Sequence, residues 1–149
     1  MGKTYTIEQW IKDVLIKPRS KLGGNAICPF LKQYLRQIQI VKTKDFSKAV
    51  AQSVDLMGPL GLEAVILYGK KWDYDKLMSR VEQWNSTYGA RDIEILAMHP
   101  DTVDPPLPYE YNYPEWPLVI VQKRSTLHKA RNELAKNTNY YNIYDQSNK

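Results

Sequence analysis

Cys28 and His99 are the two side chains whose sequence neighbours best suit them to chemistry, and Cys28 is the only cysteine in the chain. Pro29 follows Cys28, and proline is favoured at the first position of a helix. The N–H groups and positive dipole end at a helix start favour a thiolate, so we expect the Cys28 thiol to ionise below the usual pKa of about 8.5. His99 directly follows an apolar stretch, residues 93–98, that has the composition of a strand. We therefore expect it at the carboxyl edge of a sheet, where α/β proteins gather ligands.

Together these two residues predict a thiolate–imidazolium pair as the catalytic group. His99 would take the thiol proton, Cys28 would attack an electrophilic carbon or sulfur, and Asp101 or Asp104 would orient the imidazole. A second interpretation stays open for each residue. Cys28 packs as a small buried side chain beside Phe30, and His99 only hydrogen-bonds a backbone carbonyl. The other histidine, in the last predicted helix, lies among charged residues, where we expect it exposed.

Other catalytic and binding signatures are missing from the sequence. Cysteine and histidine do not occur at the paired spacings of a zinc site, so we expect no metal. The glycines of residues 22–25 lack the Lys-Ser/Thr pair of a phosphate-binding loop, and no serine has the flanking glycines of a hydrolase elbow. The sequence names neither a cofactor nor a substrate.

Charge and hydropathy restrict the partners. The net charge of +5 is spread along the chain rather than clustered, which argues against a nucleic-acid partner. No apolar run approaches the roughly 18 residues of a membrane span, and the first residues are polar. A single cysteine cannot form an internal disulfide, which fits a reducing compartment. We expect a soluble, cytoplasmic protein that binds neither membranes nor nucleic acid.

The spacing of apolar residues predicts helices and strands in alternation. Spacings of three and four predict a helix between Thr6 and Pro18, one closed by Gly58-Pro59, one ended by Gly89 and one capped by Ser125. Short apolar runs predict four strands, at residues 37–42, 64–68, 93–98 and 118–121.

This order of elements predicts an α/β or α+β fold. We expect a single domain over residues 1–149, with a mixed sheet of about four strands, helices packed against it and a polar tail from about residue 137. The segment 101–117 is long for a loop, and its prolines and aromatic residues favour an ordered loop that packs beside His99.

Several of these residues recur together in a known pattern: Trp10, Cys28-Pro29-Phe30, His99-Pro100-Asp101, Asn112 and Trp116-Pro117. The pattern resembles the bacterial domain of unknown function 1415 family (DUF1415), over roughly Trp10 to Leu127. The chain departs from the family at Tyr113, where the family has arginine. The family has no assigned reaction, so the resemblance implies a site at Cys28 and His99 without naming its chemistry. We expect three further residues on the substrate side of this site, Asp101, Asn112 and Trp116.

Two functions from different classes stay open. The first is a small soluble enzyme or small-molecule-binding protein with a Cys28/His99 pocket next to the loop of residues 101–117. The second is a non-catalytic interaction protein that binds a protein partner through this loop and the tyrosine-containing tail. The sequence favours the first, because packing alone would accept residues other than Cys28 and His99. It does not decide whether the protein is an enzyme, and it does not predict the oligomeric state.

Overall fold

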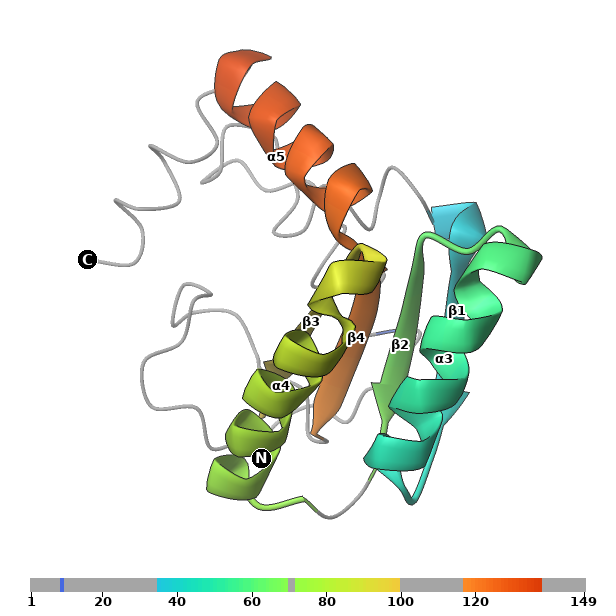
Figure 1. Cartoon of the computed structure of the whole chain (residues 1–149), viewed down its shortest axis with the longest axis vertical. Helices are drawn as coiled ribbons and strands as arrows, with labels where there is room; N and C mark the ends of the chain where they lie inside the picture. The colour runs from blue at the N-terminus through green and yellow to red at the C-terminus, as the bar shows by residue number, and fades with distance from the viewer. Residues whose placement is uncertain (1–8, 10–34, 70–71, 100–116, 138–149) are drawn as a thin grey trace.

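Four strands form one mixed sheet in the computed structural model, which describes Gln9 and residues 35–69, 72–99 and 117–137 (Figure 1). The order across the sheet is β1-β2-β4-β3. β1, β2 and β3 run parallel to one another, and β4 runs antiparallel between β2 and β3. The strands span Ile38–Lys42 (β1), Ala64–Tyr68 (β2), Ile93–Met98 (β3) and Leu118–Lys123 (β4). The α/β fold expected from the sequence is confirmed.

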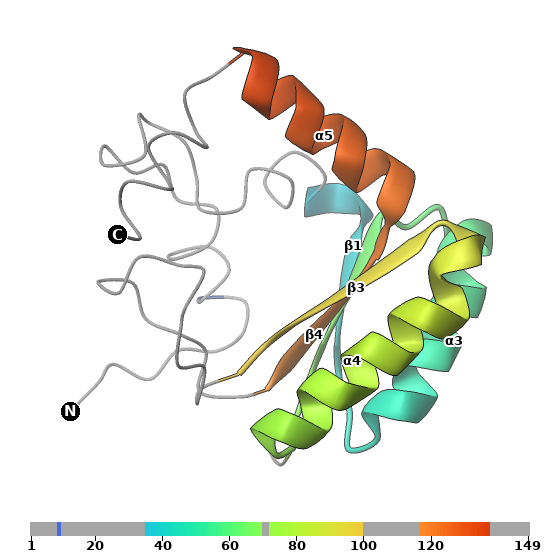
Figure 2. The same cartoon turned by 60° about the vertical axis from the view of Figure 1, so that its left-hand side comes forward.

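Two helices cover one face of this sheet, and both belong to crossovers between parallel strands. α3 (Phe46–Leu60) joins β1 to β2, and α4 (Tyr74–Tyr88) joins β2 to β3. Figure 2 shows both helices on the same side of the sheet. Their apolar stripes bury against alternate strand residues, which supplies most of the described core. This core includes Phe46, Val50, Met57, Leu77 and Trp84 from the helical side and Val65, Leu67, Ile95, Val119 and Val121 from the sheet.

The central strands β2 and β4 are buried on both faces. Val65 and Leu67 meet the helices, and the intervening Ile66 is also fully buried on the opposite face. A strand enclosed on both sides needs apolar residues at successive positions, which explains the continuous run of β2. The prediction that residues 64–68 form a central strand is confirmed, because β2 pairs with β1 on one side and β4 on the other.

A third helix, α5 (Arg124–Asn137), follows β4 directly and lies on the face of the sheet opposite α3 and α4 (Figure 2). Among its described side chains only Leu127 is buried. Short 3-10 turns, η3 (Leu35–Gln37) and η4 (Gly89–Arg91), precede β1 and β3. α5 therefore has a small apolar contact with the sheet compared with α3.

The end of α3 differs from the prediction that Gly58-Pro59 closes the helix. α3 continues through Pro59 to Leu60, and Gly61 takes the left-handed conformation at φ 64°. A proline in the last turn removes only one intrahelical hydrogen bond, so the helix tolerates it there. The carbonyls of Gly58 and Met57 accept bonds from Gly61 and Leu62, a glycine-terminated ending.

The start of α5 also differs from the prediction, because Ser125 lies inside the helix and is not its cap. α5 begins at Arg124, and β4 runs two residues further than expected, to Lys123. The backbone N–H of Ser125 donates instead to the carboxylate of Asp92, a residue far away in sequence. A tertiary contact thus provides the cap that the local sequence pattern assigned to Ser125.

Apart from Gln9, the first predicted helix lies outside the described residues, as do the Cys28 segment, most of the loop of residues 101–117 and the tail after residue 137. Within the part of the chain that the structure describes, no helix is long and apolar enough to cross a membrane.

Candidate functional site

His99 lies directly behind the last residue of β3, at the edge where the three parallel strands end. Its side chain is buried, with 5% of the residue exposed. Loops that follow parallel strands meet at this edge, and α/β domains place their ligand-binding groups there. The predicted position of His99 is therefore confirmed.

The imidazole of His99 is held by a backbone carbonyl. Nε2 lies 2.6 Å from the carbonyl oxygen of Trp72. A carbonyl can only accept, so Nε2 carries a proton and donates it, and the lone pair of the neutral ring is then on Nδ1. The ring of Tyr74 meets the imidazole edge to face, with centroids 5.6 Å apart at 85°. The hydrogen bond to Trp72 identifies the tautomer of the neutral ring, and the contact with Tyr74 helps to orient it.

The carbonyl of Trp72 is itself held in place by the start of α4. Asp73 is the N-cap of α4, and its carboxylate accepts the backbone N–H of Lys76 at 3.1 Å. The Trp72 indole packs edge to face on Phe46, with centroids 5.1 Å apart, and the Lys76 ammonium lies 4.8 Å from the indole centroid. Cap and ring contacts fix the backbone on both sides of the carbonyl.

Close backbone packing ties the strand ends together at the same edge. The N–H of Thr43 donates to Tyr68 and the N–H of Gly69 to Pro117, at 2.9 and 3.3 Å. A Cβ on Gly69 would lie 2.4 Å from the carbonyl oxygen of Thr43, closer than real Cβ atoms approach. Glycine is therefore required where β2 leaves the sheet.

The structure describes one of the site residues that the sequence predicted. His99 bonds a backbone carbonyl, as its second interpretation expects. The same bond identifies Nδ1 as the basic nitrogen of the neutral ring. Cys28, Asp101, Asn112 and Trp116 lie outside the described residues, so the pairing of Cys28 with His99 stays a prediction.

Sequence reasoning missed Trp72 and Tyr74, which position the histidine from the start of α4. A signal for them was present in the sequence. Aromatic residues flank Asp73, and an aspartate at this point, directly before a helical apolar pattern, marks an N-cap.

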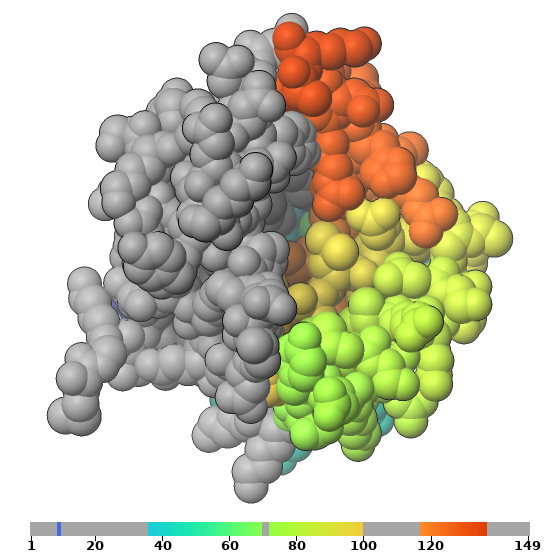
Figure 3. Space-filling view, turned by 90° about the vertical axis from the view of Figure 1, so that its left-hand side faces the viewer, coloured from blue at the N-terminus to red at the C-terminus, as the bar shows by residue number. Residues whose placement is uncertain are grey.

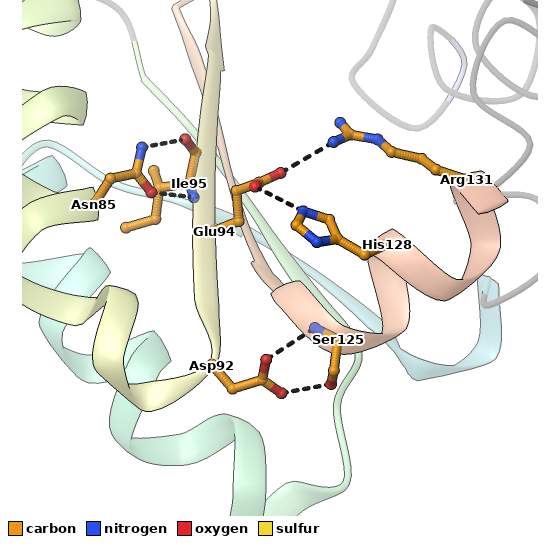
Figure 4. A network of polar contacts seen from close by, with 7 residues as sticks. All are labelled: Asn85, Asp92, Glu94, Ile95, Ser125, His128 and Arg131. Carbon is orange, nitrogen blue, oxygen red and sulfur yellow. Dashed lines mark hydrogen bonds and ion pairs between the residues drawn. The ribbon is translucent and has the colours of Figure 1, made fainter.

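A second polar cluster lies at the other end of β3, between that strand and α5 (Figure 4). Asp92 accepts the backbone N–H of Ser125 at 2.8 Å and its hydroxyl at 2.5 Å. The carboxylate of Glu94 faces His128 and Arg131, each at 3.3 Å. His128 is exposed as predicted, with 51% of its side chain accessible, but it contributes to the docking of α5. No local sequence pattern indicates this contact between β3 and α5.

Metal binding is not indicated by either cluster. Within the described ranges, no group of three or more His, Cys, Asp and Glu side chains lies close enough to hold a metal ion.

No family model, curated protein or solved structure matches this chain. The resemblance to the domain of unknown function 1415 family rests on the sequence pattern alone and stays a prediction.

Proposed function

We propose that the protein is a small enzyme or small-molecule-binding protein whose site is built around His99, with Cys28 as its nucleophile. The observation that carries the proposal is the hydrogen bond from Nε2 of His99 to the Trp72 carbonyl. A buried histidine with a fixed tautomer, at the carboxyl edge of parallel strands, is the arrangement expected of a general base.

The tautomer suits proton transfer from a thiol. In the neutral ring Nδ1 is the basic nitrogen, and it would take the proton of Cys28 as sulfur adds to the carbonyl carbon of an activated acyl group. The C=O electron pair would move onto the oxygen, and its return would break the bond to the leaving group, which would take up the proton from Nδ1. The imidazolium that results still donates from Nε2 to the Trp72 carbonyl, and a hydrogen bond from a charged donor is stronger than one from a neutral donor. The Trp72 carbonyl would therefore hold the ring in place in both protonation states.

The support for Cys28 comes from its own sequence context. Pro29 after it predicts a helix start, where a thiolate is favoured. The substrate class that follows is a small molecule with an electrophilic carbon, such as an activated acyl group. The alternative function is to bind a protein partner through the loop of residues 101–117. The alkylation rate of Cys28 distinguishes the two functions.

The single cysteine makes the test direct. The alkylation rate of the folded protein by iodoacetamide would be measured from pH 5 to pH 9 in wild type, His99→Gln and His128→Gln. Glutamine can still donate to the Trp72 carbonyl, so His99→Gln keeps the structural bond and loses the base. We expect the wild-type thiol to react faster near pH 7 than an unperturbed thiol, and His99→Gln to slow it by at least about tenfold.

His128→Gln is the matched control, because it removes the other histidine of the chain and should leave the rate unchanged. Circular dichroism would verify that each variant is folded. A wild-type thiol that reacts no faster than in the unfolded chain, with no effect of His99→Gln, would exclude the thiol mechanism and favour the interaction protein.

A further inference from the structure

β3 forms one edge of the four-stranded sheet in the described part of the chain. The backbone N–H of Arg124 donates to the carbonyl of Asp92 at 2.8 Å, and the antiparallel register pairs these two positions. The carbonyl of Asp92 and the N–H and C=O groups of alternate residues after it, beginning with Glu94, therefore face β4. The N–H and C=O groups of the intervening residues, Ile95 among them, point away from β4 in the plane of the sheet. An outward row of this kind is a template for another strand.

One side chain bonds the peptide groups of Ile95, the central residue among those that point away from β4. Asn85 of α4 reaches the strand, where its Oδ1 accepts the N–H of Ile95 at 2.7 Å and its Nδ2 donates to the carbonyl of Ile95 at 2.9 Å (Figure 4). One donor and one acceptor on the same residue are the two bonds that an antiparallel strand would make there. The amide of Asn85 therefore takes the place of a neighbouring strand.

The edge is otherwise suited to pairing. Figure 3 faces this side of the molecule and shows the yellow part of the chain, which contains β3, reaching the surface between α4 and α5. Leu96 is 39% exposed, and it is an apolar side chain on a strand that pairs on one side only among the described strands. The strand is rich in isoleucine and leucine and carries one charged residue, Glu94, which favours strand addition.

We propose that the side chain of Asn85 blocks the β3 edge and so prevents it from pairing with the same edge of a second copy of this chain. A strand that pairs with itself across a two-fold axis is self-complementary, so a second copy is the partner that needs no further segment. An antiparallel pair centred on Ile95 would place Glu94 opposite the partner's Leu96, twice. The sheet would then run continuously through both copies.

Asn85→Ala tests directly whether the Asn85 side chain blocks the β3 edge. Alanine is a stronger helix former than asparagine, so α4 is retained. Sedimentation velocity over a concentration series should show self-association at least about tenfold tighter than in wild type. In dilute solution the Ile95 amide should exchange with deuterium at least about tenfold faster. If Asn85→Ala does not fold, Asn85→Ser, which also removes the paired bonds, is judged by the same criteria.

Asn85→Asp is the matched variant. Its carboxylate still accepts the N–H of Ile95, cannot donate to the carbonyl, and adds a charge to the edge, so it should not raise self-association. Unchanged association of a folded Asn85→Ala protein would overturn the proposal.

The register is tested in the Asn85→Ala background. Leu96→Glu would place like charges opposite each other at the partner's Glu94 and should abolish the association, whereas Leu96→Lys would place opposite charges there and should retain it. Equal effects of the two substitutions would exclude pairing centred on Ile95.

Discussion

A histidine lies near each end of β3, and the two side chains differ in burial and in bonding partner. His99, behind the carboxyl end, is 5% exposed and bonds a backbone carbonyl. His128, across from the amino half of the strand, has 51% of its side chain exposed and faces the carboxylate of Glu94. A buried ring held by a backbone carbonyl can serve as a base, whereas an exposed contact with a carboxylate is screened by solvent and contributes little to stability. The surroundings, rather than the residue type, separate a candidate catalytic group from a surface contact.

The same contrast applies to the elements that meet each end. At the carboxyl end, aromatic rings and a helix cap position His99. At the amino end, α5 is attached by carboxylate contacts and by Leu127, its one buried side chain among those described. Few buried apolar contacts mean a low free energy of local opening. The two ends of β3 should therefore respond differently to substitution.

The largest difference should come from truncating the two histidines. His99→Ala leaves the Trp72 carbonyl without its donor and opens a cavity, so we expect a loss of about 2 to 4 kcal/mol in the free energy of unfolding. His128→Ala removes only a contact to Glu94 at the surface, so we expect a loss below about 0.5 kcal/mol. Urea denaturation of both variants measures the comparison. Equal losses would mean that the His99 contact is not structurally important.

A smaller effect is expected from Asp92, which caps α5 and has φ 62°, a left-handed conformation. Asp92→Ala loses the cap and places a Cβ-bearing residue with no compensating side chain in that conformation, for a total of about 2 kcal/mol. Asp92→Gly relieves the backbone and loses only the cap, at about 1 kcal/mol. Asp92→Asn keeps an acceptor and tolerates the left-handed region, so it should cost least.

We expect the loss in unfolding free energy to decrease in the order Asp92→Ala, Asp92→Gly, Asp92→Asn. This order separates the contribution of the cap from that of the left-handed backbone conformation. Hydrogen exchange of the α5 amides would show whether the loss is confined to that helix. Glycine at least as destabilising as alanine would mean that the backbone conformation carries no strain.

Much of the described fold follows from local sequence patterns. The apolar runs of β2 and β3 located those strands to the residue, and the spacing of Leu77 and Trp84 located α4. These patterns are visible because one strand is enclosed on both faces and the helix on one. The errors fall at element ends, at Pro59 and Ser125, where a proline tolerated in a last turn and a distant carboxylate override the local signals.

The sites were less predictable than the fold. His99 was located from its place after a strand, but its partner Trp72 lies 27 residues earlier in the chain. Asn85 bonds Ile95 because a helix passes over an edge strand, and Glu94 meets α5 residues more than 30 positions away. Such contacts depend on how elements pack, and no spacing within one element reports them.

The smallest effect sharpens the comparison at the amino end, where Glu94 faces Arg131 at 3.3 Å. A double-mutant cycle with Glu94→Gln, Arg131→Ala and the combined variant isolates the pair, because arginine stays charged at every working pH. Partial exposure of both side chains, 19% and 43%, predicts a coupling of about 0.5 kcal/mol. In 1 M salt the coupling should fall close to zero, since the screening length drops to about 3 Å. A coupling above about 2 kcal/mol that persists in salt would show that α5 is docked as firmly as the elements around His99, and the contrast between the two ends would fail.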